Sequence, residues 1–110
     1  MSNADDEALR RIAQRISRVS SEATKEEGLQ GCSVASASIT AVSETMDNEL
    51  MAFNIWNIKF RRDDGSGKDI NQQPTTTISV EARPEKDNEM LKAEIARKLH
   101  EAEWKTIGDV

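Results

Sequence analysis

The sequence predicts an α+β domain in which a three-stranded antiparallel meander is flanked by an N-terminal and a C-terminal helix. Amphipathic helical patterns occupy the two ends of the chain, and three strand-like runs lie between them. Because the connections between these runs are short, neighbouring strands are expected to pair in antiparallel fashion. We therefore expect the order α-β-β-β-α in two layers, with both helices on one face of the sheet.

The first helix is indicated by apolar residues spaced three and four positions apart between Asp5 and about Glu26. These apolar residues are Leu9, Ile12, Ile16, Val19 and Ala23. Acidic residues in the first turn suit the positive end of the helix dipole, and Gly28 and Gly31 lie where the helix should end.

The second helix is expected to follow Pro84, with Asp87 or Asn88 as its N-cap and Gly108 placed to close it. Its apolar stripe is formed by Leu91, Ile95, Leu99 and Ala102.

The two outer strands are predicted from alternating residues. Residues 32–43 alternate small apolar with hydroxyl side chains, and residues 46–49 carry turn residues that would fold the chain back. Residues 75–83 alternate in the same way, and Pro74 is tolerable at the start of a strand. Few charges lie on these outer strands, so addition of a partner's strand to the sheet edge is also considered.

The central strand, residues 50–61, is the most apolar run and contains Phe53, Trp56 and Phe60. Its apolar residues change parity, because Phe53 and Ile55 are odd whereas Trp56, Ile58 and Phe60 are even. Two explanations remain open. Either a β-bulge near Ile55 returns the odd residues to the core side, or both faces of the sheet are covered, the second one by another copy or a partner.

The remainder of that second face would be flat, short-chained and uncharged. It would consist of Ser36, Ser38, Thr40, Asn57, Thr75, Thr77 and Ser79. Such a face is either a solvated surface of good strand formers or a docking platform. The candidate partner-binding residues are Phe53, Ile55, Thr40, Asn57 and Thr77.

The sequence carries no recognisable set of catalytic or metal-binding residues. His100, the only histidine, should face solvent opposite the apolar stripe, and Cys32, the only cysteine, is expected to be a small, half-buried filler. Residues 62–74 match neither a phosphate-binding nor a calcium-binding loop and are expected to form a flexible hairpin loop. We therefore expect no enzyme, no cofactor, no metal and no small-molecule substrate.

The chain length and the cysteine count are those expected of one domain, residues 1–110, in a reducing compartment. The 110 residues carry a net charge of -5, and a single cysteine cannot form an internal disulfide. The absence of an apolar membrane-spanning run or signal-like start predicts a cytoplasmic protein without membrane partners. Residues 1–4 include the Ser-Asn-Ala left by some tag cleavages. They are therefore set apart from the domain as either native or tag-derived, and either ordered or disordered.

Basic residues provide the alternative function. The candidate nucleic-acid contacts are Arg11, Arg15, Arg18, Arg61 and Arg62. The predicted element order also occurs in double-stranded-RNA-binding domains, whose second helix opens with a lysine cluster. Here that helix opens with Glu85, Asp87 and Glu89, so we assign the chain to no family.

The sequence favours a small acidic protein-binding module, such as an adaptor, regulator, inhibitor or assembly factor. A homodimer is included in this interpretation, because the second face could pack on its own copy. Nucleic-acid binding through the arginines is the alternative.

Overall fold

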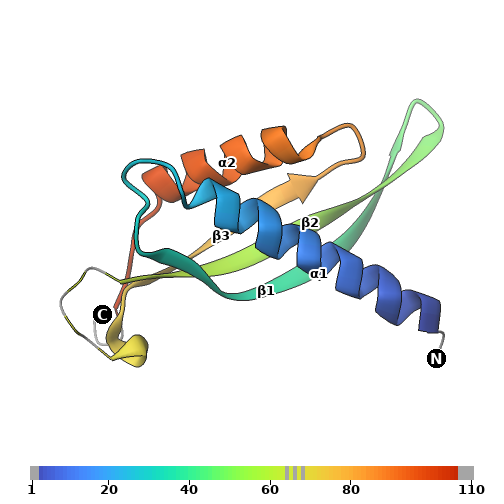
Figure 1. The fold of residues 1–110 in the computed structure, drawn as a ribbon. Helices are drawn as coiled ribbons and strands as arrows, with labels where there is room; N and C mark the ends of the chain where they lie inside the picture. The colour runs from blue at the N-terminus through green and yellow to red at the C-terminus, as the bar shows by residue number, and fades with distance from the viewer. Residues whose placement is uncertain (1–2, 64, 66, 68, 107–110) are drawn as a thin grey trace.

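A computed structural model describes residues 3–63, 65, 67 and 69–106, and it confirms the predicted α-β-β-β-α order (Figure 1). The elements are α1 (Asn3–Ala23), β1 (Cys32–Met46), β2 (Glu49–Arg62), the short 3₁₀ helix η1 (Ile70–Gln72), β3 (Thr75–Ala82) and α2 (Asn88–Glu101). The three strands form one open antiparallel sheet in the order β1-β2-β3.

Several predicted boundaries change. The first helix begins at Asn3, so two of the four residues set apart belong to α1, and residues 1–2 lie outside the described residues. In the 62–74 connection, Arg62 ends β2 and residues 70–72 form η1. Residues 64, 66 and 68 are not described, and the flexibility of this connection stays a prediction.

The second helix is shorter than expected. Asp87 is its N-cap, as one of the two predictions had it, and its carboxylate accepts a hydrogen bond from the Met90 backbone N–H at 2.9 Å. The helix ends at Glu101, and Gly108 lies outside the described residues. After α2 the chain extends along β3, where Lys105 and Thr75 exchange two backbone hydrogen bonds.

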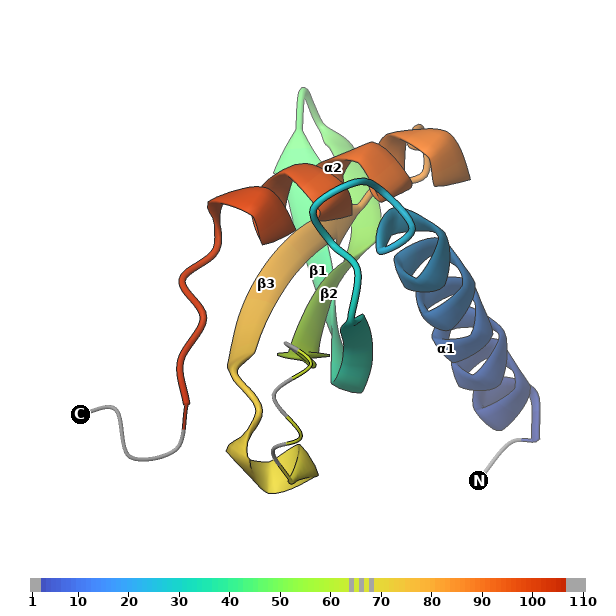
Figure 2. The same cartoon turned by 60° about the vertical axis from the view of Figure 1, so that its left-hand side comes forward.

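The first two strands form a hairpin that is longer than the rest of the sheet. Residues 54–61 of β2 pair with β3, whereas residues 49–53 pair with β1 alone. We call residues 42–53 the hairpin arm; Figures 1 and 2 show it extending past β3 and α2. Asp47 and Asn48 form its turn with φ of 51° and 67°, the left-handed geometry that tight hairpins favour.

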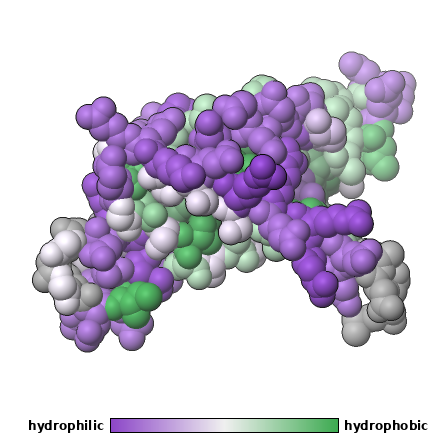
Figure 3. Space-filling model, viewed as in Figure 1, coloured by the Kyte–Doolittle hydropathy of each residue, from purple (hydrophilic) through white to green (hydrophobic). Residues whose placement is uncertain are grey.

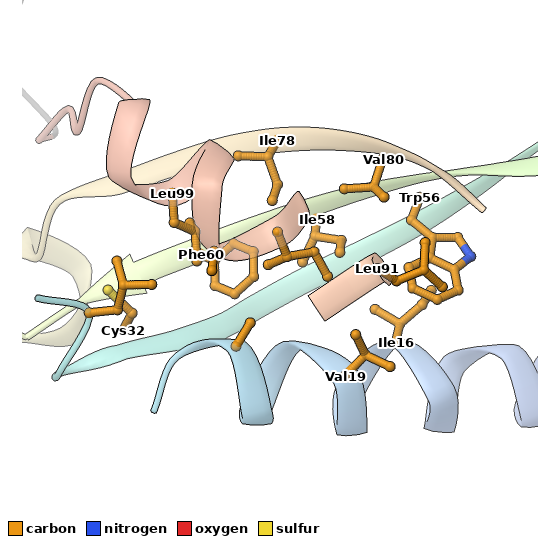
Figure 4. Packing of buried hydrophobic residues seen from close by; sticks show 14 residues of the cluster. Ile16, Val19, Cys32, Trp56, Ile58, Phe60, Ile78, Val80, Leu91 and Leu99 are labelled. Carbon is orange, nitrogen blue, oxygen red and sulfur yellow. The ribbon is translucent and has the colours of Figure 1, made fainter. Parts of the chain in front are cut away.

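Both helices cover one face of the sheet and enclose the core (Figures 1 and 2). α1 contacts β1 and α2, and α2 contacts β3. Trp56, Ile58 and Phe60 of β2 lie at the centre of the core, where they meet buried residues of both helices and of β3 (Figure 4). The other fully buried large side chains of this core are Ile16, Val19, Leu29, Val80, Leu91, Ile95 and Leu99.

The prediction of a bulge near Ile55 is wrong. Ile55 stays in register with Thr40 on one side and Glu81 on the other. The register instead shifts in β1 between Val34 and Ser36, which leaves one extra residue on that strand. Phe53 and Ile55 consequently remain on the sheet face opposite Trp56.

The bulge in β1 has a packing reason. Cys32 is aligned with Arg62 and Ile39 with Trp56, and both Cys32 and Ile39 contact the core although their numbers differ in parity. An extra residue between them is needed for two residues of opposite parity to face the same side.

Candidate functional site

The sheet face opposite the two helices is the main candidate site, and we call it the open face. Strand alternation and register place on it side chains of all three strands. They are Ser36, Ser38, Thr40, Val42 and Glu44 of β1, Met51, Phe53, Ile55, Asn57, Lys59 and Arg61 of β2, and Thr75, Thr77, Ser79 and Glu81 of β3. The five predicted partner-binding residues therefore share one face.

A row of side-chain hydrogen bonds crosses the middle of the open face. The amide nitrogen of Asn57 donates to the Thr40 hydroxyl at 3.3 Å, and the Ser79 hydroxyl donates to the Asn57 amide oxygen at 2.7 Å. Thr77 lies one row further along, opposite Lys59. These two hydrogen bonds satisfy part of the polar groups of this row, which lowers the cost of placing an apolar surface beside them.

Phe53 is buried outside the main core. Its side chain is only 6% exposed, yet it is not part of the core cluster under the helices. The guanidinium carbon of Arg83 lies 4.0 Å from the Phe53 ring centroid, a cation–π distance. Arg83 follows the last residue of β3, and the register of that strand carries it across to Phe53.

Two carboxylates hold Arg83 in this position. Its Nε donates to Glu81 at 3.0 Å, and a terminal nitrogen approaches Glu44 at 3.4 Å. The hydrogen bond from Arg83 lowers the pKa of Glu81 below its usual range, and the same contact raises the pKa of Arg83. Sequence reasoning missed this cluster, whose only signal was the shared parity of Glu81 and Arg83.

Apolar side chains surround Phe53 on the open face. Val42, Met51 and Ile55 are half-buried, and with Phe53 they form what we call the apolar strip. At the end of the hairpin arm, Met46 is 63% exposed. Figure 3 shows apolar surface at this end of the molecule from the helix side. Such a contiguous apolar surface on one side of a sheet is typical of interaction sites.

The two ends of the open face differ in charge. Lys59 and Arg61 lie toward the end of β2 that is remote from the hairpin arm, and neither has an ion-pair partner among the described side chains. The Nε of Arg61 is buried without a hydrogen-bond partner in the described part of the chain. Glu44 and Glu81 lie toward the hairpin arm, where Arg83 offsets one of the two negative charges.

The arginines proposed as nucleic-acid contacts are dispersed. Arg61 is on the open face, whereas its neighbour Arg62 is on the helix side. The guanidinium carbon of Arg62 lies 5.6 Å from the Trp104 ring centroid, and its Nη2 donates to the Gly28 carbonyl oxygen at 3.4 Å. On α1, the Nε of Arg15 donates a hydrogen bond to the side-chain oxygen of Asn88 at 2.7 Å.

The other two arginines of that set pair locally along α1. Arg11 lies 4.0 Å from Glu7 and Arg18 lies 3.9 Å from Glu22; Arg11, Glu7 and Arg18 are well exposed, and Glu22 is half-buried. Exposed pairs of this kind contribute little free energy, but they reduce the positive potential of the helix surface. The structure thus does not bring the five arginines into one basic surface.

The residues with potential chemistry lie apart from one another. His100 is exposed, and its Nε2 is 3.8 Å from a Glu26 carboxylate oxygen. Cys32 is buried; burial raises the pKa of its thiol, and the charge of Arg62 opposes this shift. Among the residues that the structure describes, no three His, Cys, Asp or Glu side chains are grouped as metal ligands.

Comparison with protein families, curated proteins and solved structures found no match to this chain. In the described residues, neither helix has the length and apolar character needed to cross a membrane.

Proposed function

We propose that this chain is a small, acidic, cytoplasmic protein-binding module that acts without catalysis and docks a partner protein on its open face. The observation that carries the proposal is the apolar strip on the sheet face opposite both helices. A strip of this kind is stabilised when a second surface removes it from water, at roughly 25 cal/mol per Å² of apolar area.

The chemistry of the open face defines the partner surface that would fit it. Ile55 and Val42 offer half-buried aliphatic side chains, and Thr40 and Asn57 offer a short polar row whose hydrogen bonds are already made. A flat, largely apolar surface, as a sheet or a helix side presents, matches this combination. An adaptor, regulator, inhibitor or assembly factor would use such a surface.

A second copy of the chain is one such partner. In a two-fold stacking of open faces with the strands antiparallel, Lys59 and Arg61 of one copy would lie over the end that carries Glu44 and Glu81 of the other. This arrangement of charge favours that orientation over one in which like ends meet.

Ile55→Lys tests the proposal. A charged side chain at the centre of the docking surface should weaken partner binding on the order of tenfold or more, because the lysine replaces apolar contact area and must be desolvated when the partner docks. The measurement is retention of a defined protein from nuclease-treated lysate of the native source, followed by titration of that protein. Self-association is measured in parallel by sedimentation equilibrium.

Ala52→Lys is the matched control, because Ala52 is an exposed residue of the same strand on the opposite face. Both variants should keep the wild-type circular dichroism. Equal binding by the two variants would contradict docking on the open face. Loss of all bound material on nuclease treatment, with steep salt dependence, would instead support the nucleic-acid alternative.

A further inference from the structure

The outer edge of β1 is unpaired in the described structure. β1 pairs with β2 on one side only, and β2 in turn pairs with β3. Residues 32–43 contain no charged residue, although charge on an edge strand is a common protection against strand addition. The edge thus presents a row of backbone groups that an extended chain could pair with.

Helix α1 continues past the part of its apolar stripe that the core buries. Ile16, Val19 and Ala23 are at most 2% exposed, whereas Leu9 of the same stripe is 54% exposed. The sheet ends at β1, so Leu9 has no further strand on which to pack, although Ile12, on the next turn, packs against the core.

A cavity of about 230 Å³ lies between this half of α1 and β1, and we call it the edge groove. It is lined by Leu9, Ala13, Ile16 and Ser17 of α1 and by Val34, Ala37, Ser38 and Ile39 of β1. In Figure 3, white to green surface lies beside α1, where Figure 1 places β1, between hydrophilic areas. The lining is mainly apolar, so it suits an aliphatic side chain better than a polar ligand.

We propose that the edge groove binds an extended segment of a partner protein, which adds to β1 as a fourth strand. The unpaired backbone of β1 requires an extended occupant, because only a strand matches a row of alternating N–H and C=O groups. Alternate side chains of that strand face the helix layer, and an aliphatic one fills the cavity beneath Leu9.

The rim of the edge groove indicates the charge of the segment. Arg10 follows Leu9 and precedes Ala13 by three positions, which places it beside the groove on the helix surface. No ion pair of Arg10 is present among the described side chains, whereas Arg11 pairs with Glu7. A segment with an acidic residue near its aliphatic anchor is therefore the best match.

A second copy fits the edge groove less well than a separate segment. In an antiparallel pairing of two β1 edges about a two-fold axis, both helix layers lie on the same side of the joined sheet. The two overhanging α1 helices would then occupy the same space above the seam. A short extended segment carries no helix of its own and avoids this conflict.

The probe is a displayed library of random ten-residue peptides, selected against the full chain. The selected peptides should alternate apolar residues and carry an acidic residue. A synthetic copy is then N-methylated at every second residue, on one edge or on the other, and binding is followed by fluorescence anisotropy. Only methylation of the edge that pairs with β1 should abolish binding, because it removes the donors for strand pairing.

Variants of the chain test whether the peptide binds in the edge groove. Leu9→Asp should weaken peptide binding at least tenfold, and Arg10→Glu should lower the affinity for acidic peptides several-fold. Arg11→Glu is the control, because it reverses a neighbouring charge away from the groove and should leave the affinity unchanged. Both Leu9 and Arg10 are exposed, so circular dichroism should show that these variants stay folded.

Three outcomes would overturn the proposal: a selection that yields no saturable ligand, binding that tolerates methylation of both edges, or binding that tolerates Leu9→Asp. Self-association that Leu9→Asp removes would assign the groove to a second copy instead. Binding lost in Ile55→Lys and kept in Leu9→Asp would support the open face alone, so the two proposals fail separately.

Discussion

Gly31 connects the loop after α1 to the start of the sheet, and its geometry admits no side chain. Its φ is +86°, and an added Cβ would overlap the backbone carbonyl oxygen of Asp63. The close approach is part of the fold, because the Asp63 N–H donates to the Gly31 carbonyl oxygen at 2.9 Å. Gly31 thus ties the end of β2 to the loop that leads from α1 into β1.

Gly31→Ala should lower the free energy of unfolding by about 3 kcal/mol, which combines left-handed backbone strain with steric overlap. Gly65→Ala is the control, since Gly65 has a φ of +80° with open space around it. Its cost should be the backbone strain alone, about 1 kcal/mol. Urea denaturation of the two variants measures the difference, and equal values would show that the Asp63 contact relaxes freely.

Glu81 gives the open face a pH dependence. Arg83 lowers its pKa in the folded state, so the stabilisation from this contact is complete above the unfolded pKa of about 4.3. It is lost as the pH falls through the lower folded pKa. The difference in unfolding free energy between wild type and Glu81→Gln should therefore be present at pH 6 and shrink in acid.

Glu85→Gln is the control for this measurement, because Glu85 is exposed and has no ion pair among the described residues. This substitution removes a carboxylate of the same kind without removing a contact to Arg83. A difference between wild type and Glu81→Gln that stays constant over the same range would contradict the role of Arg83.

The helices and strands could be predicted from the sequence because each has a periodicity that packing enforces. The stripe from Ile12 to Ala23 and the alternation of residues 75–82 both belong to elements that face one core. The bulge was placed in the wrong strand for a physical reason. Residues 32–43 are mostly Ala and Ser, whose small side chains define neither face strongly, so the change of parity at Ala35 left no clear pattern.

The candidate site was predictable to the same extent. Thr40, Asn57 and Thr77 follow from alternation within their strands, and the structure places them on one face. Arg83 was missed because its contact with Phe53 depends on the register between β2 and β3, which no local pattern specifies. The edge groove was missed as well, since it depends on how far α1 extends past β1.

The N-cap of α2 provides a prediction at the level of a single element. Asp87→Ala should lower the free energy of unfolding by about 1 kcal/mol, because its carboxylate satisfies the Met90 N–H. Asp69→Ala is matched to it, since Asp69 precedes η1 without a side-chain capping bond. Thermal unfolding followed by circular dichroism distinguishes the two, and equal losses would contradict a capping contribution.

At the level of the whole molecule, the two proposed surfaces meet at β1, where Ser38 belongs to the open face and also lines the edge groove. The open face uses side chains on the side of the sheet away from the helices, whereas the edge groove uses the backbone of β1 and the helix layer. One module could therefore hold two partners, one on the side chains of the open face and one along the edge of β1.

The hairpin arm extends beyond β3 and α2, so its two strands rest mainly on each other. Isolated two-stranded ribbons are only marginally stable in water. Local unfolding of the arm should therefore occur far more often than opening of the core around Trp56. Val42, Met51 and Phe53 lie on this arm, which makes part of the docking surface adaptable in shape. The entropy lost when a partner orders the arm then limits the affinity of that partner.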